Sequence, residues 1–77
     1  MKINVLLFGV LAEKVGEDRM AVESVGDIDS LKNYIFEKSP EIKNMSFQVS
    51  VNQTITQGNL KLNEGDEVAL LPPFAGG

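Results

Sequence analysis

Residues 65–77 of the chain read GDEVALLPPFAGG, which divides into a turn, a strand and a tail. Alternation within residues 67–71 places Val68 and Leu70 together on one face of the predicted strand. Pro72 and Pro73 end the strand, because each fixes φ at about −65° and lacks an N–H group. The tail is therefore predicted to be a stiff, extended arm that loosens only at its Gly-Gly tip. A tip without side chains suits entry into a narrow site on another protein.

Residues 47–56 predict a hairpin that precedes this last strand. Phe47, Val49 and Val51 alternate with polar residues, which is typical of a half-buried strand. Residues 52–53 are Asn-Gln and predict a turn into a short strand over residues 54–56.

The main helix is predicted to begin after Asp27, a good N-cap residue, and to end near Lys38 or Ser39 because Pro40 follows. Its apolar face is formed by residues at helical spacing, namely Ile28, Leu31 and Ile35, with Tyr34 alongside.

The first part of the chain predicts two strands joined by a short helix. Residues 2–8 are rich in Val, Leu and Phe and predict a strand that ends at Gly9. Residues 10–15 predict a helix closed by Gly16, and residues 19–23 a second strand. The natural packing is a sheet of four or five strands with the helices on one face.

Composition excludes several classes of function. The 77 residues fit one small domain, and they include no Cys and no His. This removes disulfides, thiolate metal sites, cysteine nucleophiles and the usual general base. The net charge of −4 argues against nucleic-acid binding, and no apolar run approaches the roughly 20 residues of a membrane span. We expect a cytoplasmic protein with neither a nucleic acid nor a membrane as partner.

Strand alternation also predicts an apolar surface on the far side of the sheet. If the helices cover the face that carries Val68, then Leu6, Phe8, Ala69 and Leu71 point outward. Gln48 and Ser50 are expected on that face as solvated polar residues. Exposed Phe8 and Leu71 indicate a partner site, unless Phe8 folds back over a sheet edge.

Three segments of the C-terminal third carry a family resemblance: residues 51–54 (VNQT), 62–70 (LNEGDEVAL) and 71–77 (LPPFAGG). They resemble the small subunits of molybdopterin synthase, which are ubiquitin-like sulfur carriers of the ThiS type. The similarity spans the whole chain. It implies an α+β, β-grasp fold, with a mixed four- to five-stranded sheet packed on one main helix. The first and last strands are then parallel neighbours at the centre, residues 1–71 form the domain, and residues 72–77 form a flexible tail.

The resemblance implies a cycle with two partners. An adenylating enzyme of the ubiquitin-activating type uses ATP to activate the carboxylate of Gly77, and a persulfide donor supplies sulfur to form a thiocarboxylate. The carrier docks on the large subunit of molybdopterin synthase, within a heterotetramer. There it donates sulfur to cyclic pyranopterin monophosphate in molybdenum cofactor biosynthesis. The family small subunit has no catalytic groups of its own, no bound metal and no permanent cofactor.

The resemblance also assigns roles to single residues. The tail residues that enter the partner are Pro72, Pro73, Phe74, Ala75 and Gly76. Phe8, Ile55 and Leu71 match the family's apolar docking face, in agreement with the strand alternation. Family members often carry a smaller aliphatic residue at the position of Phe74.

Other functions remain open at this point. A thiamine-pathway sulfur carrier has the same fold and terminus, although such chains are typically shorter and lack the Pro-Pro arm. A protein modifier conjugated through Gly77, or an interaction domain with an incidental Gly-Gly end, also fits. An independent enzyme is disfavoured, because the chain lacks His and Cys.

Overall fold

The computed structural model of the chain describes residues 2–73. The roles predicted for Phe74, Ala75, Gly76 and Gly77 fall outside this part of the chain. Within it, no helix has the length and apolar character needed to cross a membrane.

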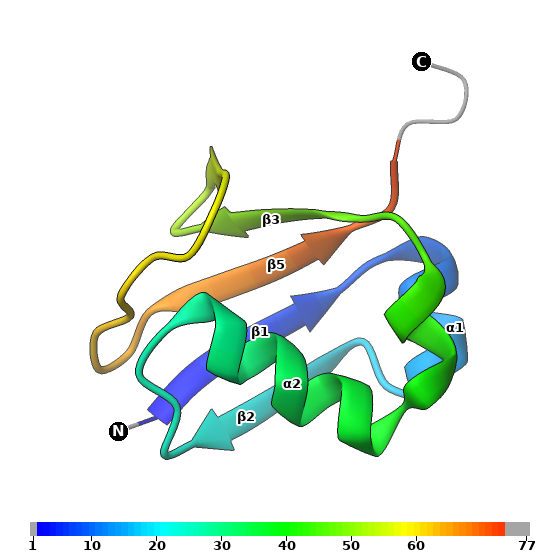
Figure 1. The fold of residues 1–77 in the computed structure, drawn as a ribbon, viewed down its shortest axis with the longest axis horizontal. Coiled ribbons are helices and arrows are strands. Elements are labelled where there is room, and N and C mark those ends of the chain that lie inside the picture. The colour runs from blue at the N-terminus through cyan, green and yellow to red at the C-terminus, as the bar shows by residue number, and fades with distance from the viewer. Residues whose placement is uncertain (1, 74–77) are drawn as a thin grey trace.

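Five strands and three helical segments form the domain (Figure 1). In chain order they are β1 (Lys2–Leu7), α1 (Gly9–Val15), β2 (Arg19–Glu23), α2 (Ile28–Lys38), the 3-10 helix η1 (Pro40–Asn44), β3 (Gln48–Val51), β4 (Thr54–Thr56) and β5 (Glu67–Leu71). The strand order across the sheet is β2-β1-β5-β3-β4. Strands β1 and β5 pair in parallel at the centre, and the other neighbours are antiparallel. The predicted β-grasp arrangement is confirmed.

The core lies between the sheet and α2, which crosses the front of the sheet in Figure 1. Alternate residues of the central strands are fully buried, for example Val5 and Val68. The apolar face of α2 meets them with Ile28, Leu31 and Ile35, as predicted. The placement of Tyr34 on this face was wrong, because its side chain is 41% exposed. One helical step is about 100°, so Tyr34 is turned away from Ile35.

Two residues cap the start of α2, one local and one distant. Oδ1 of Asp27 accepts a hydrogen bond from the N–H of Ser30 at 2.9 Å, which confirms the predicted N-cap. Asn59 adds a second cap, because its Oδ1 accepts from the N–H of Asp29 at 2.9 Å and its amide donates to Asp27 at 3.3 Å. Hydrogen bonds from Ser30, and then from Asn59, lower the pKa of Asp27.

Segment η1 was not predicted from the sequence. Pro40 ends α2 and then opens this 3-10 helix, where the missing N–H of a proline costs no hydrogen bond. Ile42 is fully buried, as is Leu11 of α1, so the two short helices close one end of the core.

Candidate functional site

The face of the sheet opposite α2 carries a continuous row of side chains across four strands. Leu6 in β1 pairs with Ala69 in β5, and Ala69 pairs with Ser50 in β3. Ser50 in turn pairs with Ile55 in the edge strand β4. Side chains of directly paired residues point to the same side of a sheet. The pairing register therefore brings Leu6, Ala69, Ser50 and Ile55 together on one surface.

A second row lies one step closer to the C-terminus of β5. Leu71 is two residues after Ala69 and so shares its face. Phe8 is two residues after Leu6 in extended backbone, and its N–H donates to the carbonyl of Leu70 at 3.2 Å. Phe8 is thus held beside the end of β5. We call the surface formed by Leu6, Phe8, Ser50, Ile55, Ala69 and Leu71 the outer face.

Large apolar side chains on the outer face remain accessible. Phe8 is 44% exposed, Ile55 is 50% exposed and Leu71 is half-buried. Phe8 therefore does not fold back to become buried. The three residues predicted to form a docking surface lie on the same side of the sheet.

Ser50 was predicted to be a solvated polar residue on this face, and that prediction was wrong. It is only 6% exposed, and Ala69 beside it is 8% exposed. Both side chains are short and sit on inner strands between larger neighbours such as Leu6 and Ile55, so they form the floor of the outer face. Gln48, the other polar residue expected there, is exposed as predicted. The alternation pattern gave the correct side of the sheet, but only the strand order shows which residues are flanked on both sides.

A polar network borders the outer face at the start of β5. The carboxylate of Asp66 accepts hydrogen bonds from the N–H of Asn63 at 2.8 Å and from the amide of Asn52 at 3.0 Å. The side-chain oxygen Oδ1 of Asn52 accepts a hydrogen bond from the backbone N–H of Glu67 at 3.0 Å. The bonds from Asn63 and then Asn52 lower the pKa of Asp66. Asn52 and Asp66 lie in two of the segments that carry the family resemblance. Their hydrogen bonds hold the turn between β3 and β4 against the turn that precedes β5.

The tail begins directly beside the outer face. Strand β5 ends at Leu71, Pro72 is half-buried, and Pro73 is exposed. The chain leaves the sheet at this point (Figure 1). A partner that covers Phe8 and Leu71 therefore also meets the first residues of the tail.

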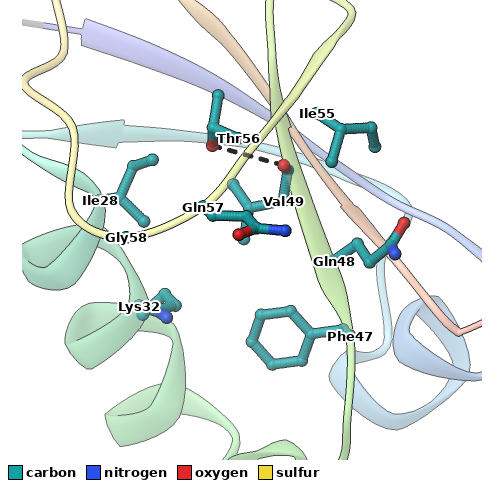
Figure 2. Close-up of a pocket in the computed structure, with 9 residues that line it drawn as sticks. All are labelled: Ile28, Lys32, Phe47, Gln48, Val49, Ile55, Thr56, Gln57 and Gly58. Carbon is teal, nitrogen blue, oxygen red and sulfur yellow. Dashed lines mark hydrogen bonds between the residues drawn. The ribbon is translucent and has the colours of Figure 1, made fainter.

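An open groove lies around the β4 edge, between that edge and α2 (Figure 2). Its walls include Ile28 and Lys32 of α2, with Phe47 and Thr56 opposite. The ammonium nitrogen of Lys32 lies 6.0 Å from the centre of the Phe47 ring, within the range of a cation–π contact. Lys32 is the one ionisable residue in the lining.

Among residues 2–73, no three Asp or Glu side chains gather closely enough to hold an ion. The arrangement that the structure does offer is an apolar surface joined to the base of a tail.

A mixed sheet with parallel central strands, crossed by one main helix, places the chain in the ubiquitin-like β-grasp class of proteins. The family model described as "ThiS family" matches residues 5–77. The chain belongs to the ThiS family. It is 34% identical to a Mycobacterium tuberculosis protein named "Molybdopterin synthase sulfur carrier subunit", over all of this chain and 99% of that one.

Solved structures agree with this fold. The crystal structure of SAMP1 from Haloferax volcanii matches with a TM-score of 0.84 at 24% identity, and covers 100% of both chains. A chain from the protein–protein complex of subunits 1 and 2 of molybdopterin-converting factor from Helicobacter pylori matches with a TM-score of 0.74. It is 25% identical, again over 100% of both chains.

Proposed function

We propose that this chain is the sulfur-carrier subunit of a molybdopterin synthase. The observation that carries the proposal is the accessible apolar outer face, which adjoins the base of a tail that ends in Gly-Gly. The name of the Mycobacterium tuberculosis relative and the two-subunit complex from Helicobacter pylori support the same role.

In this proposal Gly77 carries the sulfur. Its carboxylate is ionised at neutral pH and is a poor electrophile. It attacks the α-phosphate of ATP on an adenylating enzyme, which releases pyrophosphate and leaves an acyl-adenylate. A persulfide attacks the acyl carbon and AMP leaves. A second thiol then cleaves the resulting acyl disulfide, which gives the thiocarboxylate and a disulfide. ATP is thus consumed by the partner, and the carrier needs no permanent cofactor.

Delivery takes place on the large subunit. The outer face docks there through Phe8, Ile55 and Leu71, and the tail enters the partner's active site. The thiocarboxylate sulfur bonds to an oxygen-bearing carbon of cyclic pyranopterin monophosphate, and the carbon–oxygen bond there breaks, with the oxygen leaving as water or with the phosphate. Water then hydrolyses the resulting thioester. Sulfur stays on the pterin as a thiolate, and the Gly77 carboxylate is regenerated. Two deliveries complete a dithiolene.

The amino-acid composition indicates which chemical groups the carrier and its partners each supply. The carrier has no His or Cys, so the nucleophiles and bases come from its partners. The two prolines reduce the conformational freedom of the unbound tail and so lower the entropy lost on insertion. A heterotetramer with two large subunits at its centre and a carrier at each end fits this use of a single docking face.

Reconstitution tests the proposal. The full chain is incubated with an adenylating enzyme, ATP and a persulfide donor, and its intact mass is measured before and after the large subunit and the pterin precursor are added. We expect one oxygen to be replaced by sulfur in the C-terminal peptide, and the sulfur to be lost when the pterin is converted. Conjugates of higher mass would favour a protein modifier. A chain that stays unmodified would favour a plain interaction domain.

A further inference from the structure

The strand register continues the outer face past Leu6 to the far edge of the sheet. Leu6 of β1 pairs with Arg19 of β2, and side chains of directly paired residues point to the same side of a sheet. The row of paired residues therefore crosses all five strands, from Arg19 on the β2 edge to Ile55 on the β4 edge. Arg19 is exposed, and it is the only arginine of the chain.

The middle of this row lies on the strand that carries the tail. Ala69 of β5 occupies the central strand of the five, so Arg19 and Ile55 are each two strands away from it. Neighbouring strands lie about 4.8 Å apart, which places both edge residues about 10 Å from Ala69. A specific interface covers about 800 Å² on each partner, which corresponds to a patch with a radius of about 16 Å. A large subunit that is centred over the base of the tail and reaches Ile55 therefore also reaches Arg19.

A hollow beside Arg19 provides space for a side chain of the partner. This hollow has a volume of about 410 Å³ and lies where β1, β2 and the start of α1 meet. Its lining includes Leu6 and Phe8 of the outer face, together with Asp18 and Arg19. A partner side chain that enters the hollow would contact the exposed Phe8 and would lie within reach of Arg19.

Arg19 has no charged partner in the described part of the domain. Among the hydrogen bonds and ion pairs of residues 2–73, none joins its guanidinium to a carboxylate, although Asp18 lines the same hollow. Covering an unpaired guanidinium removes its water and is unfavourable unless an opposite charge replaces that water. A carboxylate suits this position, because the planar guanidinium can donate two parallel hydrogen bonds to its two oxygens.

We propose that Arg19 is a specificity-determining residue for docking, and that it pairs with an Asp or Glu carboxylate of the large subunit. The inference rests on the function proposed above. The ion pair lies at one end of the contact and Ile55 lies at the other, so the two together fix the rotation of the carrier on its partner. A protein that offers no carboxylate at this position would cover an unpaired charge and would be rejected.

The test is titration of the purified large subunit with variants of the full chain. Arg19→Gln removes the charge at an exposed position, so Tm is expected to stay unchanged. Lys43→Gln is the matched control, since it removes the same charge from an exposed residue of η1, away from the outer face. We expect the dissociation constant to rise about 10–30-fold for Arg19→Gln and to stay within about twofold for Lys43→Gln. Equal affinities for the two variants would overturn the inference.

Two further measurements separate an ion pair from a merely structural role. Arg19→Lys keeps the charge but cannot donate two parallel hydrogen bonds, so we expect its affinity to lie between those of the wild type and Arg19→Gln. Salt screens charge pairs, so raising NaCl from about 0.05 to about 0.5 M should weaken the wild type more than Arg19→Gln. The same salt dependence in both chains would contradict the ion pair.

Charge reversal then identifies the partner carboxylate. We expect Arg19→Glu to weaken binding about 100-fold. Each exposed Asp or Glu of the large subunit is changed to Lys in turn, and one such reversal should restore most of the affinity of Arg19→Glu. If none does, or if Arg19 affects only the adenylating enzyme, the inference is wrong. A wild-type chain that does not bind the large subunit would instead refute the proposed function itself.

Discussion

Ile55 provides the most direct test of the outer face as a docking surface. It lies on the edge strand β4, in the row of paired residues that also contains Ser50, and it is 50% exposed. Half of an isoleucine corresponds to about 80–90 Å² of apolar area, and its burial is worth about 2 kcal/mol at about 25 cal/mol per Å². Truncation to alanine removes about 1.5 kcal/mol of this, which raises the dissociation constant about tenfold.

The assay is isothermal titration of the purified large subunit with wild-type and Ile55→Ala chains. Leu60→Ala is the matched control. Leu60 is also a large exposed aliphatic residue, at 42%, but it lies outside the strands and its carbonyl accepts a hydrogen bond from Ile28 of α2. We expect Leu60→Ala to bind as the wild type does. An unchanged affinity for Ile55→Ala, or an equal loss for Leu60→Ala, would refute the assignment of the outer face.

Three further predictions concern the tail, the polar network and the core. Deleting Gly77 is expected to abolish sulfur transfer while Tm and binding to the large subunit are retained; an active deletion variant contradicts the tail mechanism. Hydrogen bonds from Asn63 and then Asn52 lower the pKa of Asp66 in the folded state. The Asp66 carboxylate therefore stabilises the fold at pH values above 3.8, the pKa of the unfolded state. This contribution is lost as the pH falls through the folded pKa. Urea unfolding should therefore show Asp66→Asn less stable than wild type at about pH 7, with a smaller difference below about pH 3; an equal difference at both is the contrary result. Ile42→Ala, at a fully buried position, should lower the free energy of unfolding by about 2–5 kcal/mol, and a urea-measured loss under about 1 kcal/mol would mean that η1 is not part of the cooperative core.

Local elements followed well from the sequence, because short-range spacing and capping determine them. Asp27 and Pro40 set the limits of α2 through an N-cap and a missing N–H. The turn at Asn52 and Gln53 has positive φ at both residues, 50° and 72°, and Asn52 is a residue type that tolerates this conformation. The error at Tyr34 shows the limit of this reasoning, since one helical step separates a core residue from an exposed one.

The candidate site was predicted in part. Alternation placed Phe8 and Leu71 on the correct side of the sheet, and the family resemblance added Ile55. Neither predicted that Ser50 is buried, because burial on that face depends on which strands flank β3. The parallel pairing of β1 and β5 was likewise implied only by the resemblance.

The sequence by itself determined the extent of α2, the hairpin of β3 and β4, and a tail without reactive side chains, since each depends on residues close together in the chain. Only the tertiary structure decided the second cap from Asn59 and the link between Asn52 and Asp66. The first joins residues 30 positions apart in the chain, and the second joins residues 14 positions apart. Contacts at such separations form only when sheet order and register are fixed, and no local pattern encodes them.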